Sequence, residues 1–137
     1  MVEPPLSARI VLADTTVTTG GTINGEVVVA NNTGEDLTVM GCRGIFAVAL
    51  ANEAVAPFPQ WPACAQEITI PIGESVHPVT VSAQHMACST TSVNETLVRC
   101  ENDGSLPPLP PGQYEARLYQ STEVVPAPTP VEVRLTR

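Results

Sequence analysis

The chain has 137 residues, a length that fits one domain with its own hydrophobic core. Fourteen acidic residues against six basic ones give a formal net charge of −8, which argues against nucleic-acid binding and against docking on anionic lipid. Hydrophobic residues make up 43% of the chain, too many for a disordered segment, and no apolar run reaches the ~18 residues of a membrane span. We therefore expect a single folded domain over residues 1–137.

Alternation of apolar and polar residues, the period of a half-buried β-strand, dominates the sequence. Runs of this kind, or short apolar runs bounded by turn residues, occur in chain order at 9–12, 22–31, 37–39, 45–50, 55–58, 68–70, 79–81, 114–118 and 131–135. No window keeps a helical period, and 14 prolines disfavour long helices. The pattern predicts an all-β fold, an immunoglobulin-like antiparallel β-sandwich of seven to nine strands with a disulfide-stapled loop insertion.

Four cysteines occur in this short β-rich chain, and their positions suggest two disulfides. Cys42 and Cys64 are equidistant from a predicted hairpin turn at 52–53, so in-register strands would bring them together. Cys88 and Cys100 lie inside a long insertion and would staple it. We favour Cys42–Cys64 and Cys88–Cys100, with Cys64–Cys88 as the strongest rival contact, across a second predicted hairpin that turns at 73–75.

The cysteines also indicate a compartment, because disulfides persist in oxidising, extracytoplasmic surroundings. The first residues do not form a signal peptide. We therefore expect an export signal, a lipid anchor or a membrane helix upstream of Met1 in the natural protein. All six basic residues are Arg, a bias that suggests a high-GC bacterial genome.

Catalytic and metal-binding constellations are weak in this sequence. The cysteine spacings are too wide for the close pairs of a structural zinc site. Met40, His85 and Met86 offer soft ligands for copper, and Ser89, His85 and Asp103 could form a triad, but no nucleophile-elbow motif accompanies them. We expect no catalytic residue, no metal and no cofactor.

Two loops are candidates for contact with a protein partner. The first holds Phe58 and Trp61 between prolines that would stiffen it, although Trp61 could instead cap the core beside the Cys42–Cys64 bridge. The second is the insertion Gln84–Gly112, where Leu97 or Arg99 could be presented beside Cys100.

Short motifs add a resemblance. The segment 111–114, Pro-Gly-Gln-Tyr, opens a strand and resembles the tyrosine corner of immunoglobulin-like folds. The segments 28–33, 37–39, 68–75 and 109–114 together resemble the strand and turn markers of the bacterial intracellular proteinase inhibitor family. The resemblance implies the fold class and no particular functional residue. The cysteines and the 84–112 insertion depart from that family's pattern.

The sequence therefore favours a non-enzymatic, extracytoplasmic interaction or structural module of a bacterial cell-envelope protein, either a lipoprotein or the ectodomain of a membrane protein. Its partner would be a protein, with no nucleic acid involved and with membrane contact only through an anchor outside this sequence. The alternative is a proteinase inhibitor that presents the Cys88–Cys100 loop, with Leu97 or Arg99 as its specificity residue.

Overall fold

The computed structural model describes residues 5–90 and 98–137, and in these ranges every regular element is a β-strand. The strands are, in chain order, β1 (Leu6–Leu12), β2 (Thr16–Thr18), β3 (Thr22–Asn31), β4 (Leu37–Gly41), β5 (Phe46–Ala51), β6 (Gln66–Ile70), β7 (Gly73–Ser82), β8 (Cys88–Ser89), β9 (Val98–Arg99), β10 (Gly112–Gln120) and β11 (Val131–Thr136). The all-β prediction is confirmed. Nothing in the described ranges is a helix that could cross a membrane.

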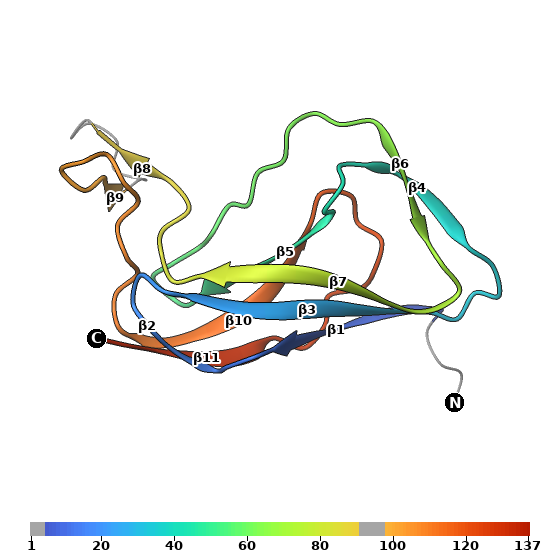
Figure 1. Ribbon diagram of the computed structural model, residues 1–137, viewed down its shortest axis with the longest axis horizontal. Helices are drawn as coiled ribbons and strands as arrows, with labels where there is room; N and C mark the ends of the chain where they lie inside the picture. Colours follow the sequence, from blue (N-terminus) through green and yellow to red (C-terminus); the bar gives the residue numbers. More distant parts are fainter. Residues whose placement is uncertain (1–4, 91–97) are drawn as a thin grey trace.

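Two larger sheets and two strand pairs organise these elements (Figure 1). The first sheet has the order β1-β3-β7, and the second has the order β2-β11-β10-β5. The remaining pairs are β4–β6 and β8–β9. The chain changes sheets between β1, which runs antiparallel to β3, and β2, which runs parallel to β11. The pair β8–β9 is also parallel, so the expectation of a purely antiparallel fold was wrong at two places.

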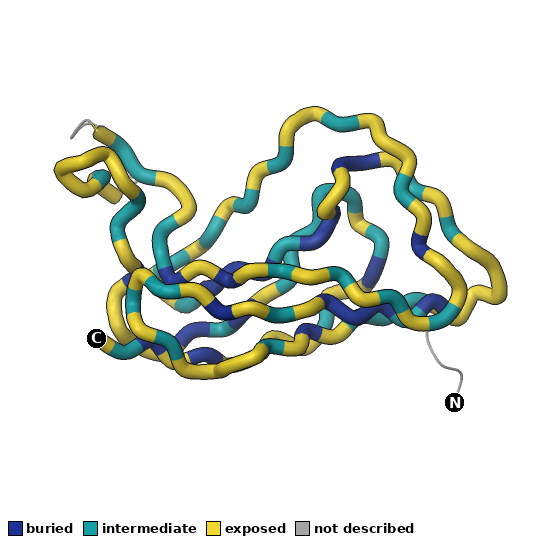
Figure 2. The backbone as a smooth tube through the Cα atoms, viewed as in Figure 1, coloured by how far each residue is buried: buried dark blue, intermediate teal, exposed yellow. Residues whose placement is uncertain are grey.

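The core lies between the two larger sheets, where alternate residues of their strands meet. Val27 and Val29 of β3 are fully buried with Val81 of β7, and they share one cluster with Ala116 and Val133 of the second sheet. Burial of each such valine contributes roughly 1.5–3 kcal/mol. Figure 2 shows that buried residues follow these strands, whereas the projecting segment around β8 and β9 is intermediate or exposed.

Neither predicted hairpin forms. β5 pairs with β10, from Phe46↔Gln120 to Ala51↔Glu115, and the following residues 52–65 contain no strand. β6 pairs with β4, while β7 pairs with β3. The turn between β6 and β7 falls before Gly73, whose φ of 86° suits glycine, and β7 begins at that residue. Alternation located most strand segments correctly but could not show which strands pair.

Two buried polar side chains fix the ends of the strands. Asn31 is 1% exposed; its Nδ2 donates to the carbonyl oxygens of Glu35 and Ile70, and its Oδ1 accepts from the backbone and hydroxyl of Thr33. Tyr114 is 2% exposed, and its hydroxyl donates to the carbonyl oxygen of Pro110 at 2.7 Å. This bond has the geometry of a tyrosine corner.

Candidate interaction site

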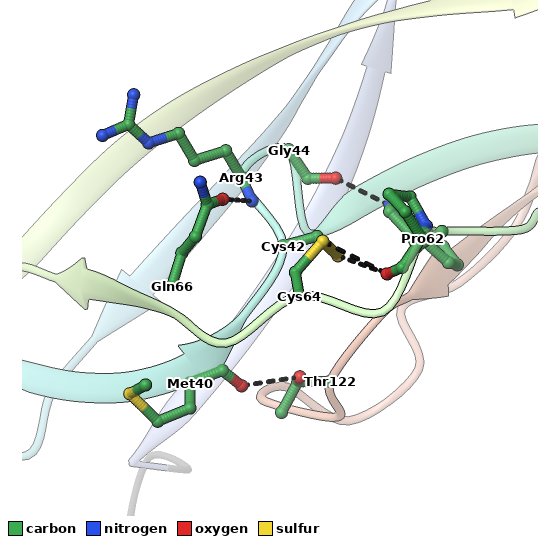
Figure 3. Close-up of a disulfide and its surroundings, with 9 residues drawn as sticks. Met40, Cys42, Arg43, Gly44, Pro62, Cys64, Gln66 and Thr122 are labelled. Carbon is green, nitrogen blue, oxygen red and sulfur yellow. Dashed lines mark hydrogen bonds between the residues drawn. A yellow bond between two sulfur atoms is a disulfide. The ribbon is translucent and has the colours of Figure 1, made fainter.

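The Cys42–Cys64 disulfide closes the end of the β4–β6 pair. Gly41 is opposite Gln66 in the register, so Cys42 leaves β4 at the point where Cys64 approaches β6, with 4.9 Å between the Cα atoms. The backbone N–H of Arg43 donates to Gln66 Oε1 at 3.1 Å and holds the same junction (Figure 3). The predicted pairing is therefore present, but the β4–β6 ladder produces it instead of a hairpin around residues 52–53.

The carbonyl of Pro62 lies against this bridge. Its oxygen is 3.0 Å from the sulfur of Cys42 and 3.1 Å from the sulfur of Cys64 (dashed in Figure 3). Because disulfide sulfurs carry no hydrogen, these are close sulfur–oxygen approaches and not donated hydrogen bonds. They place residues 61–63 directly over the bridge.

The two aromatic candidates of this loop have different roles. Trp61 is half-buried, and its Nε1–H donates to the carbonyl oxygen of Gly44 at 3.0 Å, which ties the loop to the segment that joins β4 and β5. Gly44 has a φ of 67°, a conformation that suits glycine at this turn. Phe58 is 71% exposed. Trp61 thus fixes the loop, and Phe58 is the aromatic side chain it presents to solvent.

An open hollow of about 320 Å³ lies beside the bridge. The residues that line it include Met40, Cys42, Trp61, Pro62, Cys64 and Thr122. Thr122 Oγ1 donates to the carbonyl oxygen of Met40 at 2.9 Å and so joins the segment after β10 to β4 (Figure 3). The approach is so close that a Cβ at Gly41 would come 2.7 Å from Thr122 Oγ1.

Sequence reasoning did not find the contributions of Met40 and Thr122 to this hollow. Met40 is 56% exposed at an outward-facing position of β4. A large apolar residue at a polar position of an alternating strand was the available signal. Thr122 is brought there by a tertiary contact that no local pattern reveals.

The second candidate region is the insertion, which projects at the opposite end of the molecule from β4 and β6 (Figure 1). The Cys88–Cys100 disulfide is present as predicted, with 5.0 Å between the Cα atoms. The N–H of Cys100 donates to the carbonyl oxygen of Ser89 at 3.0 Å, and Arg99 of β9 is exposed. Leu97 lies outside the described residues.

At the base of the insertion, backbone bonds attach it to the end of β7. The N–H of His85 donates to the carbonyl oxygen of Pro107, and the N–H of Leu109 donates to that of Ala83, each at 2.9 Å. The stem of the insertion is therefore fixed to the first sheet.

The alternative chemistries are not assembled. Asp103 accepts hydrogen bonds at Oδ1 from the backbone and hydroxyl of Ser105, which lower the pKa of its carboxyl group; it is thus engaged away from any triad. Met40 lies on β4, whereas His85 and Met86 follow β7 at the opposite end (Figure 1). Among residues 5–90 and 98–137, no cluster of three or more His, Cys, Asp or Glu could hold a metal ion.

His77, expected at the surface, is half-buried. Its ring contacts Phe46 edge-on at a centroid distance of 5.0 Å, and its Nε2 lies 2.9 Å from Ser75 Oγ. Burial lowers the pKa of His77. This residue belongs to the packing between β5 and β7.

Comparison of the chain with protein-family models, with curated proteins and with solved structures finds no match.

Proposed function

We propose that this chain is a non-enzymatic, extracytoplasmic interaction module of a bacterial cell-envelope protein. The observation that carries the proposal is the exposed Phe58 on a braced loop. The two disulfides support the compartment, because such bonds form and persist in oxidising surroundings.

The scaffold we propose is an immunoglobulin-like sandwich. In that fold one sheet contains strands A, B and E, and the other contains C, F and G. The order β1-β3-β7 corresponds to A-B-E, and β5-β10-β11 corresponds to C-F-G. The Tyr114 hydroxyl bond to Pro110 occurs near the start of the strand that corresponds to F, the usual place of a tyrosine corner. Strand order and corner together support this class.

Phe58 fits the role of an interface anchor. A phenylalanine that is 71% exposed gains nothing from the core of its own domain, whereas aromatic side chains are enriched at interfaces between proteins. Pro57 and Pro59 flank it, and Trp61 is hydrogen-bonded to Gly44. Because the loop is already ordered, less conformational entropy is lost when a partner binds.

Site-specific photo-crosslinking tests the proposal. A photoreactive amino acid replaces Phe58 in the full-length protein in the source bacterium, and a matched derivative carries it at Thr80, an exposed residue of β7. We expect a discrete adduct from position 58 in the envelope fraction and none from position 80. The same adduct pattern from both positions, or no adduct from position 58, would reject the proposal.

One observation favours proteinase inhibition as a second candidate. Arg99 is exposed in the extended strand β9, directly before a disulfide-bonded cysteine and at the far end of the molecule. A stapled, extended loop can enter a protease cleft without much loss of entropy. Titration against trypsin-, subtilisin- and elastase-like enzymes tests it: trypsin-like inhibition that Arg99→Ala removes would support this candidate, and the absence of inhibition would eliminate it.

A further inference from the structure

The hollow beside the Cys42–Cys64 bridge has walls suited to the alkyl part of a long side chain. They include the thioether of Met40, the indole of Trp61 and the ring of Pro62, together with the hydroxyl-bearing Thr122. Its volume of about 320 Å³ is at the lower end of the range for ligand pockets, so one side chain fits it better than a cofactor. An indole wall is also the aromatic surface that attracts cations most strongly.

The rim of the hollow is acidic. Glu67 is opposite Met40 in the β4–β6 register, and both side chains are exposed on the outer face of the pair. Exposed Glu123 follows Thr122 directly. The ion pairs of the described residues join Arg9 to Glu74 and Arg117 to Glu115, so these two rim carboxylates have no basic partner there.

The nearest basic residue in the sequence does not compensate this charge. Arg43 follows Cys42, but Figure 3 shows that its guanidinium group points away from Met40, Thr122 and Pro62. The chain as a whole carries a net charge of −8. A cation that enters the hollow therefore gains from the rim and from the field of the whole molecule.

We propose that this hollow receives a basic side chain, arginine in preference to lysine, from a polypeptide partner. The guanidinium group stacks on the Trp61 indole, its alkyl stem lies along Met40, and the charge faces Glu67 and Glu123. Arginine is preferred because its planar, weakly hydrated guanidinium stacks on aromatic rings better than an ammonium group does. The inference rests on the proposed function, since it supplies the chemistry of the partner.

NMR titration of the purified, disulfide-bonded domain tests the inference. The probes are N-acetylated, C-amidated tripeptides with Arg, Lys, Gln or Glu between two glycines, and the signal is the indole N–H resonance of Trp61, the single tryptophan of the chain. We expect a saturable shift with the Arg peptide, with a Kd on the order of 1–10 mM, a weaker shift with Lys, and none with Gln or Glu.

Matched variants locate the binding. Glu67→Gln should weaken the Arg peptide by about threefold, because it removes one exposed carboxylate from the rim. Glu26→Gln, the same change at an exposed position of β3, should leave the affinity unchanged. Equal responses to the Arg and Gln peptides, an unmoved Trp61 resonance, or equal effects of the two variants would overturn the inference.

The two experiments separate the inference from the function on which it rests. If the peptides do not bind while crosslinking through position 58 succeeds, the interaction module stands and the basic-side-chain inference falls. If the Arg peptide binds selectively but position 58 captures nothing, the module proposal falls at the Phe58 surface.

Discussion

Removal of the two disulfides, one at a time, gives the sharpest prediction. The variants are Cys42→Ala with Cys64→Ala, and Cys88→Ala with Cys100→Ala. Their sequence separations are 22 and 12 residues. If each bridge acted only by restricting the unfolded chain, the losses of stability would be about 3.4 and about 2.8 kcal/mol, a small difference.

The structure predicts that the losses are very unequal. The first bridge joins β4 to β6, and Cys42 is 5% exposed, so the junction stays ordered by strand pairing when the bridge is absent. The folded state then gains little entropy, and the loss should approach the full value of about 3 kcal/mol, which lowers Tm by roughly 10 °C in a domain of this size.

The second bridge closes a segment outside the core. Among the described residues, none between 85 and 107 belongs to the core cluster or packs against it. Without the bridge this segment can loosen in the folded state as it does in the unfolded state, so the entropy gained nearly cancels between them. We expect the loss of global stability to be less than about 1 kcal/mol, with the opening confined to the insertion.

Urea denaturation followed by far-UV circular dichroism measures both values, since this signal reports on all the strands. Trp61 fluorescence is unsuitable alone because it senses the first bridge locally. Amide hydrogen exchange should show loss of protection at residues 98–100 in the second variant and unchanged protection in β3. Equal losses of stability in the two variants, or a larger loss in the second, would refute the reasoning.

Three further predictions concern buried polar groups. Asn31→Ala leaves the buried Ile70 carbonyl without its side-chain donor and should cost roughly 3 kcal/mol in urea unfolding; a cost under 1 kcal/mol would contradict this. Tyr114→Phe removes only the hydroxyl bond to Pro110 and should cost about 1–2 kcal/mol by the same measurement. Burial holds the pKa of His77 below its ordinary value of 6.5, so the unfolded chain binds more protons and stability should fall as the pH drops through about 6.5. His77→Gln should flatten that part of the pH profile, and an unchanged slope would exclude His77 as its source.

The sequence identified the fold class and both disulfides because alternation and cysteine spacing are local features. It failed where pairing partners are distant in the chain. The run 45–50 is apolar on both faces, so its pattern could not distinguish pairing with a return strand from pairing with β10, about 70 residues later. The Cys42–Cys64 prediction was thus correct for a reason that the structure replaces.

The candidate site was predicted in part. Phe58 and Trp61 were singled out because prolines surround them, and the structure separates their roles into an exposed and an anchored aromatic. The hollow was missed because its walls come from β4, from the loop before β6 and from the segment after β10, which only the tertiary fold brings together. Leu97 stays a prediction.

The crossing of the N-terminal strands between sheets has a mechanical consequence. The described chain begins at one end of the molecule, near Pro5, and finishes at the other with Arg137 (Figure 1). Tension applied through these two ends pulls β2 and β11 past each other along their length, and β1 past β3 in the same way. The hydrogen bonds of each ladder then share the load and must break together instead of opening one after another. A slow rate of forced unfolding should follow, a useful property for a module under tension in a cell envelope.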